Sequence, residues 1–337
     1  MIRYSQAGDP FIPARHQPAL VLDYARSRDV AAAGLVRGTG LLPLGVPAAG
    51  DLLAPRDYLQ LLANVNGALA SPDTSFMLGQ QMLPGHYGAV SHALLHAQNL
   101  RQALNTLVAW QSRLCPLLSP RWREEGDLAV LYWSDAFGAP GQLPFLVEMH
   151  MTAVVALCRW LGGQRLPWRF CFNRCAPRQR EQHEVHLGPA LQFDCHLDAM
   201  LIDAHWLDQP WPRGNATAAA VALDEIAHAT DAPALLVALY DYLLQQIRCA
   251  PTLEGTAAAF GTSAATLKRH LARHGTHFQA ELDQVRTHVA LYLFQMRRYD
   301  NEQAATYLGF HDATNFRRSF KRWTGQTPSF LRSFLNG

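Results

Sequence analysis

The chain has 337 residues, of which 49% are hydrophobic and 17% are charged, so it is long enough for two domains and apolar enough to bury a sizeable core. This composition excludes an intrinsically disordered chain. The formal net charge is only +2, but residues 251–337 hold 11 lysines and arginines against 6 aspartates and glutamates, whereas residues 1–250 hold the remaining 18 against 21. A basic tail behind a mildly acidic body indicates a polyanionic partner for the tail.

The first residues, MIRYSQAGDPFIPARH, have no apolar core of the kind found in signal peptides, and no apolar run approaches the roughly 18 residues of a membrane span. The six cysteines are scattered along the chain. Without an export signal, we expect them to be reduced thiols. These features predict a cytoplasmic protein that does not enter a membrane.

The N-terminal part mixes helical and strand patterns. Residues 1–20 are proline-rich and are predicted to be irregular. Apolar residues at helical spacing predict helices over 21–36, 56–70, 90–110 and 144–163, and short strands are predicted over 127–133 and 168–173. This order predicts an α+β domain over residues 1–207.

A change of composition follows the N-terminal part. Residues 208–232 open with DQPWPRGN and are rich in small residues, so we predict a linker region there. Helical patterns then continue almost to the end, which predicts an all-α C-terminal domain over residues 233–337.

The C-terminal part contains one plan twice, over residues 256–278 and 304–328. In each copy a helix of small residues ends at a glycine, Gly261 or Gly309, which can adopt the left-handed conformation of a sharp turn. A capping residue, Ser263 or Asp312, then opens a second helix, because its side-chain oxygen can accept a hydrogen bond from an exposed backbone amide.

Both second helices are apolar on one face and basic on the other. The apolar pairs lie four residues apart, at Leu267 and Leu271 and at Phe316 and Phe320. A helix, a glycine-containing turn and a basic second helix form the helix-turn-helix plan, whose second helix lies in the major groove of DNA. Residues 281–298 keep helical apolar spacing and predict a rod of roughly 27 Å. This rod is long enough to hold two reading helices roughly one DNA turn, about 34 Å, apart.

The tail resembles the DNA-binding domain of the AraC/XylS family of bacterial transcription regulators. The second copy is similar to the family signature at Leu308, Gly309, Phe310, Phe316, Arg318, Phe320, Lys321, Trp323, Gly325, Pro328 and Arg332. The first copy is similar at Ser263, Leu267, Arg269, Leu271, Gly275, Phe278 and Arg286. Thr256 and Ala304 depart from the pattern, since the family usually has Val or Ile there. Their smaller apolar bulk is expected to soften the first helix of each unit.

Family position also implies which residues contact DNA. It gives base-reading places at Ala265, Lys268 and Arg269 in the first copy and at Ala313, Thr314, Arg317 and Arg318 in the second. The basic faces of the two second helices add Arg273, Lys321 and Arg322 as DNA-binding residues. Arginine and lysine can pair with guanine, and alanine and the threonine methyl can contact thymine methyls. For Arg269 and Arg318 the interpretation stays open between a base contact and a role in packing or phosphate binding.

Residues 86–118 and 188–203 resemble the arabinose-binding-type N-terminal domain of the AraC subfamily that includes regulators of ornithine use, virulence and quorum sensing. The resemblance implies an effector-sensing and dimerising domain, with promoter or operator DNA and RNA polymerase as partners. Activation is the favoured direction of regulation, and the choice between activator and repressor stays open. The effector stays open. An apolar pocket with an arginine or histidine at its mouth would favour a fatty-acid-like or other amphipathic carboxylate, and a polar pocket an amino acid or sugar.

The sequence offers weaker signals for a metal site and for enzyme chemistry. Cys171 and Cys175, with His183 and His186 behind them, are residue types that bind zinc, but their spacing is loose and favours ordinary packing. No nucleophile elbow and no phosphate-binding loop is present, and no cofactor is implied. The alternative is an enzyme-like or metal-binding N-terminal domain fused to a DNA-binding tail.

Overall fold

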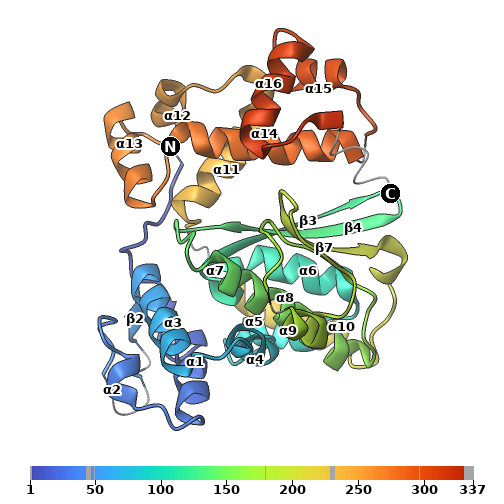
Figure 1. Ribbon diagram of the computed structural model, residues 1–337. Coiled ribbons are helices and arrows are strands. Elements are labelled where there is room, and N and C mark those ends of the chain that lie inside the picture. The colour runs from blue at the N-terminus through green and yellow to red at the C-terminus, as the bar shows by residue number, and fades with distance from the viewer. Residues whose placement is uncertain are drawn as a thin grey trace. The chain divides into compact units, whose positions relative to one another are not determined.

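The computed structural model describes residues 2–42, 47–48, 50–178, 180–227, 232–295 and 297–329. Arg332, which belongs to the family resemblance, lies outside these residues. The chain forms two compact units: an N-terminal unit, Ser5–Ala232, and a C-terminal unit that combines Met1–Tyr4 with Pro233–Gly337 (Figure 1). The N-terminal unit is mixed α/β and residues 235–324 of the C-terminal unit are helical, so the predicted fold class is confirmed.

The N-terminal unit combines helices with a five-stranded sheet and a two-stranded sheet, β1–β2. Its helices are α1 (Gln17–Arg26), α2 (Ala32–Leu35), α3 (Pro55–Leu69), α4 (Thr74–Met82), α5 (Ala89–Leu95), α6 (Leu100–Ala109), α7 (Gln111–Leu114), α8 (Leu143–Gly162), α9 (Glu181–Leu187), α10 (Ala216–Ile226) and the 3₁₀ turn η1 (Ala204–Trp206). Its strands are β1 (Ile12–Pro13), β2 (Leu52–Leu53), β3 (Leu118–Glu125), β4 (Leu128–Asp135), β5 (Arg169–Cys171), β6 (Leu191–Gln192) and β7 (Asp198–Asp203).

The sheet has the strand order β3-β4-β7-β5-β6, and only the β5–β6 pair is parallel. Strands β3 and β4 form a hairpin in which Glu125 is opposite Leu128. The two-residue loop between them begins with Gly126 at φ 56°, which glycine adopts without strain. The strand predicted over 127–133 is β4, while the sequence did not predict its partner β3.

Helices α6 and α8 pack on the same face of this sheet. The ring of Trp133 on β4 lies 5.6 Å from that of His150 on α8, and Trp122 on β3 donates a hydrogen bond to Asn105 on α6. Trp122 is opposite Leu131, two residues before Trp133, so both tryptophans point to one face.

Helix α8 is the central helix of the N-terminal unit. It packs closely on α4 at Gly79. A Cβ atom at this position would lie only 2.3 Å from the Met149 carbonyl oxygen of α8, so the close approach requires glycine. Alone among the described helices, α8 is long and apolar enough to cross a membrane, which corrects the expectation that no segment approaches that length. However, 67% of its most apolar stretch is buried inside the fold, as expected for a core helix.

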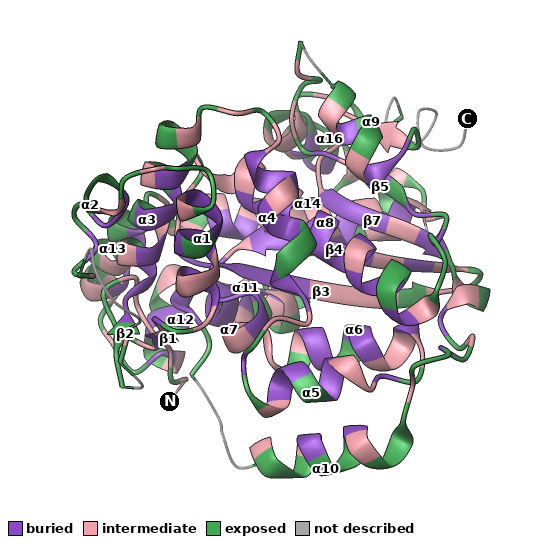
Figure 2. Cartoon of the chain, turned by 90° about the horizontal axis from the view of Figure 1, so that it is seen from below, coloured by how far each residue is buried: buried purple, intermediate pink, exposed green. Residues whose placement is uncertain are grey.

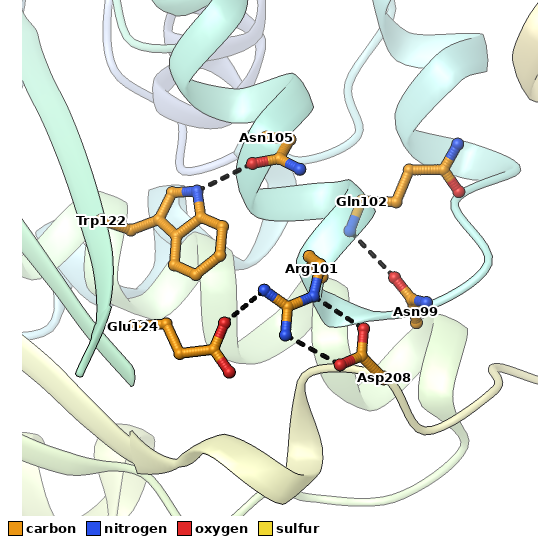
Figure 3. Close-up of polar contacts among 7 residues, drawn as sticks. All are labelled: Asn99, Arg101, Gln102, Asn105, Trp122, Glu124 and Asp208. Atoms are coloured by element: carbon orange, nitrogen blue, oxygen red, sulfur yellow. Dashed lines mark hydrogen bonds and ion pairs between the residues drawn. The ribbon is translucent and has the colours of Figure 1, made fainter. Parts of the chain in front are cut away.

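Arg101 joins α6 to two other segments of the N-terminal unit (Figure 3). Its guanidinium donates to Asp208 through Nε, at 2.7 Å, and through Nη2, at 2.8 Å, and it also contacts Glu124 on β3. Its guanidinium carbon lies 5.7 Å from the centre of the Trp122 ring. Arg101 lowers the pKa of both carboxylates. This cluster ties the start of α6 to the end of β3 and to the segment after η1.

Four segments differ from the sequence expectation. The helix predicted over 90–110 is two helices, α5 and α6, because the extended Asn99 accepts a hydrogen bond from the Gln102 amide and starts a new helix. The predicted linker 208–232 contains α10, which Asn215 caps and which buries Ala219 and Ala222. Figure 2 shows α10 beside α5, with much of its outer side exposed. The helix predicted over 21–36 ends at Arg26, and the segment predicted to be irregular contains β1 and the start of α1.

The C-terminal unit is a set of helices around one apolar core. They are α11 (Leu235–Gln246), the 3₁₀ turn η2 (Ile247–Cys249), α12 (Leu253–Ala259), α13 (Ala264–Arg273), α14 (Phe278–Gln295), α15 (Asn301–Tyr307) and α16 (Ala313–Thr324). The core includes apolar residues from all six α-helices. Helix α14 has 18 residues and lies between the two pairs α12–α13 and α15–α16, as predicted for the rod that joins two helix-turn-helix units.

Candidate DNA-binding interface

The first helix-turn-helix unit consists of α12 and α13. The chain leaves α12 at Phe260 and turns at Gly261, whose φ is 65°. Ser263 then caps α13, because its Oγ accepts a hydrogen bond of 3.1 Å from the Thr266 amide. Leu267 and Leu271 are fully buried, so they fix which face of α13 points away from the core.

The second unit repeats this geometry with α15 and α16. Gly309, at φ 73°, makes the turn, and the carboxylate of Asp312 accepts a 2.7 Å hydrogen bond from the Asn315 amide. This bond lowers the pKa of Asp312, which therefore stays charged at the positive end of the helix dipole. Phe316 and Phe320 are fully buried beneath α16, and Gly325, at φ 73°, ends the helix.

The predicted DNA-contacting residues lie on the opposite faces of α13 and α16. All of them are exposed except Ala313, which is half-buried; the exposed ones are Ala265, Lys268, Arg269, Arg273, Thr314, Arg317, Arg318, Lys321 and Arg322. Each recognition helix therefore presents a basic surface to solvent, and two buried apolar residues on its other face anchor the helix to the core.

Two of the arginines on α16 have partners within the C-terminal unit. Arg317 reaches back along its own helix and donates to the Ala313 carbonyl and the Thr314 hydroxyl, both at 3.3 Å. Arg322 lies 3.5 Å from the carboxylate of Asp283 on α14. These contacts are long and their arginines are exposed, so they orient the side chains at little cost to a later DNA contact.

Arg286 of α14 is packed against other side chains of the C-terminal unit, unlike the exposed arginines of the recognition helices. Its guanidinium lies over the rings of Phe310 and Trp323, with centroid distances of 5.3 and 6.0 Å, and 3.9 Å from Asp283. Burial lowers its pKa. Arg286 therefore packs the second unit onto α14 and does not belong to the exposed basic surface.

The structure adds one element that the sequence did not reveal. Ile2 donates its amide to the Ala259 carbonyl at the end of α12, and Tyr4 lies against Phe260 with a ring distance of 5.6 Å. The hydroxyl of Tyr4 also hydrogen-bonds to His270 on α13. The first residues of the chain thus form part of the first helix-turn-helix unit, and no local pattern in the sequence signals a contact over this separation.

The cysteines and histidines of the candidate zinc site have other contacts. Nε2 of His183 donates a 3.1 Å hydrogen bond to the Glu148 carboxylate, and the ring packs against those of Phe76 and Phe172. Cys171 is half-buried and Cys175 is exposed. In the described part of the chain, no three His, Cys, Asp or Glu side chains are grouped to hold a metal ion.

Comparison with known proteins gives two family matches. Residues 30–211 match the arabinose-binding domain of AraC transcription regulator, N-term, and residues 256–333 match a helix-turn-helix domain. The chain is 24% identical to the ornithine utilization regulator of Pseudomonas aeruginosa over 326 residues, covering 95% of this chain and 96% of that protein. The HTH-type transcriptional regulator VqsM of the same organism is 32% identical over 85 residues, 25% of this chain and 26% of that protein.

Among solved structures, the crystal structure of transcriptional regulator CdpR from Pseudomonas aeruginosa is similar, with a TM-score of 0.39 and 20% identity. The similarity covers 78% of this chain and 87% of that chain.

Proposed function

We propose that this chain, which belongs to the AraC family of transcription regulators, activates transcription when a small-molecule effector binds its N-terminal unit. The family match spans residues 30–211, and the helix-turn-helix match spans residues 256–333. The chain is therefore a DNA-binding transcription regulator with an N-terminal ligand-binding domain, and not an enzyme. The direction of regulation and the response to an effector belong to the proposal.

The observation that carries the DNA-binding part is the pair of exposed basic helices, α13 and α16, each backed by a buried apolar pair. We assign base reading to Ala265, Lys268 and Arg269 in the first unit and to Ala313, Thr314, Arg317 and Arg318 in the second. Arg273, Lys321 and Arg322, at the C-terminal ends of the two helices, are assigned to phosphates. Phosphate contacts supply affinity and register, whereas base contacts supply specificity.

Partners and location are also part of this proposal. The family resemblance supports a homodimer formed through the N-terminal unit, contact with RNA polymerase at a promoter, and a cytoplasmic location. Light scattering on the full chain at micromolar concentration tests the dimer, since a monomeric mass contradicts it. The domain division that we propose places effector binding and dimerisation in the N-terminal unit and DNA binding in the C-terminal unit.

The function is tested by selecting DNA duplexes from a random pool with the full chain and footprinting the selected sequence. Two reading helices on one face of the duplex predict two protected major-groove segments roughly one helical turn, about 34 Å, apart. Transcription with purified RNA polymerase from a promoter bearing that sequence should then rise when the protein is added. A fall in transcript would identify a repressor, and the absence of any selected sequence would contradict sequence-specific binding.

A further inference from the structure

The N-terminal unit contains a cavity of about 620 Å³ that the DNA-binding proposal does not use. It lies where α8 meets α4 and α9, which are neighbours in the fold (Figure 1). Its volume falls within the range of about 300–1,000 Å³ that is usual for sites of small organic ligands. The cavity is therefore large enough for a metabolite.

Three arginines from different segments line this cavity: Arg159 of α8, Arg165 just after α8, and Arg213 just before α10. All three are exposed, and no Asp or Glu is among the described residues that line the cavity. Arg213 lies over the Trp160 ring at 5.4 Å, and Arg165 donates to the backbone carbonyl of His186 at 2.9 Å. The cavity thus gathers positive charge without a matching carboxylate, which favours an anionic ligand.

His186 also lines the cavity. It supplies a hydrogen-bond donor in a fixed orientation without adding positive charge. Its ring stacks on Phe76 at 5.0 Å, and burial lowers its pKa, which favours the neutral ring. The amide nitrogen of Gln80 lies 2.9 Å from Nδ1 of His186. An amide nitrogen can only donate, so Nδ1 accepts and the ring proton is on Nε2.

The rest of the lining is apolar. Trp160 and Val185 are 43% and 66% exposed, and both lie at this cavity with the buried Val155, so the cavity has an apolar wall that a ligand can reach. The buried Thr152 also lines it, and the Thr152 Oγ1 has no hydrogen-bond partner in the described structure. An apolar wall next to clustered arginines matches a ligand that has both an apolar body and a negative charge.

We propose that this cavity binds an organic carboxylate with an apolar body, and that this carboxylate is the effector of the regulator. The carboxylate accepts hydrogen bonds from Arg159 and Arg165, while the apolar body covers Trp160 and Val185. This inference rests on the proposed function, because it assigns to the effector a place and a chemical class. The proposal also predicts that the cavity prefers a carboxylate to an amine of the same shape, because an amine would find no Asp or Glu among the described lining residues.

The test uses the full chain and octanoate as the probe, with 1-octanol and octylammonium as ligands of similar shape but different charge. Calorimetry should show octanoate binding at least about tenfold more tightly than either analogue, because neither analogue can accept the charge-assisted hydrogen bonds that the arginines donate to a carboxylate. Arg159→Gln should weaken octanoate binding about tenfold or more, on the same basis. Arg178→Gln, which removes an exposed arginine outside the cavity, is the matched control and should bind octanoate as the unaltered chain does.

Thr152→Val provides a second variant, because it keeps the side-chain shape and removes the unpartnered hydroxyl. It should melt at the same temperature as the unaltered chain or higher, and bind octanoate more weakly. A lack of octanoate binding, equal binding of 1-octanol, or an equal loss in Arg159→Gln and Arg178→Gln would overturn the proposal.

Failure of the site and failure of the regulator can be told apart with the selected DNA duplex. If octanoate does not bind while the chain still binds that duplex and raises transcription, the cavity proposal is wrong and the proposed function stands. If octanoate binds in the arginine-dependent way but changes neither DNA binding nor transcription, the site is confirmed and its role as the effector site is wrong.

Discussion

The hydroxyl of Tyr4 lies 3.1 Å from Nδ1 of His270, so the fourth residue of the chain holds the recognition helix of the first helix-turn-helix unit. The Tyr4 ring also contacts Phe260, the residue that follows the last turn of α12 as its C-cap. Both helices of that unit are therefore contacted by a segment that precedes the whole N-terminal unit. A fragment that begins at residue 233 would lack this support.

Removing the Tyr4 side chain should loosen α13. Tyr4→Ala loses an aromatic contact worth about 0.5–1.5 kcal/mol and a hydrogen bond worth about 0.5–1.5 kcal/mol. Hydrogen–deuterium exchange on the full chain should therefore speed up at the amides of α13. Tyr4→Phe should show a smaller change, and Arg3→Ala, at an exposed neighbour, is the control. Unchanged exchange in Tyr4→Ala would show that the arm does not support this helix.

Substitutions on the two faces of α16 should separate DNA binding from folding. Arg317→Ala and Arg318→Ala should each weaken binding to the selected duplex by about 1–3 kcal/mol per lost base contact, with little effect on the melt. Phe320→Ala should instead lower the stability of the C-terminal unit by about 3–5 kcal/mol, because the ring is fully buried.

The matched control for the two arginines is Arg248→Ala, an exposed arginine of η2 outside both recognition helices. Melting curves and duplex binding are measured on all four variants. If the arginine variants stay folded and bind the duplex as tightly as the control, the second unit does not read bases and the first must carry specificity alone.

The helix-turn-helix units were predictable because their signals are local. Ser263 and Asp312 each accept a hydrogen bond from the backbone amide three residues further along, and the apolar pairs beneath α13 and α16 lie four residues apart in the sequence. The same kind of signal at Asn99 is hidden in the sequence, because the apolar spacing of residues 90–110 continues across the break between α5 and α6. The cap at Asn99 therefore divides a segment whose apolar spacing alone predicts one continuous helix.

Helix α10 and the cavity beside α8 depend on tertiary contacts that local sequence patterns do not predict. Helix α10 buries only Ala219 and Ala222, so its apolar side is too small to distinguish it from a linker. The cavity beside α8 brings together Gln80, Arg159, His186 and Arg213, which are separated by tens of residues in the sequence. Such a site follows from tertiary packing, and the spacing of residues in one segment cannot predict it.

Thr256 gives a prediction about stability within the first unit. Its side chain is fully buried in α12, and its hydroxyl has no hydrogen-bond partner in the described structure. Thr256→Val keeps the shape and removes a buried polar group, so it should stabilise the C-terminal unit by about 1 kcal/mol. Thr306→Val is the control, because the Thr306 hydroxyl is exposed and donates to the Glu302 carbonyl at 2.9 Å. Thermal melts that show no gain, or the same gain in both variants, would contradict this account.

Affinity for DNA should depend steeply on salt. Each arginine or lysine that contacts a phosphate of duplex DNA releases condensed counterions, with a log–log slope of about −0.9 per contact. Binding of the full chain to the selected duplex between about 50 and 200 mM salt should therefore weaken sharply, and Lys321→Ala should make the slope less steep by about one contact. A flat response would remove the electrostatic basis of the interface.

His150 should make the N-terminal unit sensitive to acid. Burial lowers its pKa from 6.5 to about 4, and Nδ1 lies 2.8 Å from the Leu146 carbonyl oxygen, to which it donates. The unfolded chain gains a proton on this ring below about pH 6.5, while the folded chain resists protonation until about pH 4. Stability that is present above pH 6.5 is therefore lost as the pH falls through this window, by roughly 3 kcal/mol in total.

The measurement is the free energy of unfolding of the full chain at several pH values between 7 and 4. His150→Leu removes the group that must be protonated, so the decline of stability across this range should be shallower in this variant than in the unaltered chain. His205→Leu, at an exposed histidine of η1, is the matched control. If His150→Leu and His205→Leu give the same dependence on pH, the buried ring does not cause the acid sensitivity, and carboxylates held by arginine, such as Asp208 and Glu124, become the groups to test.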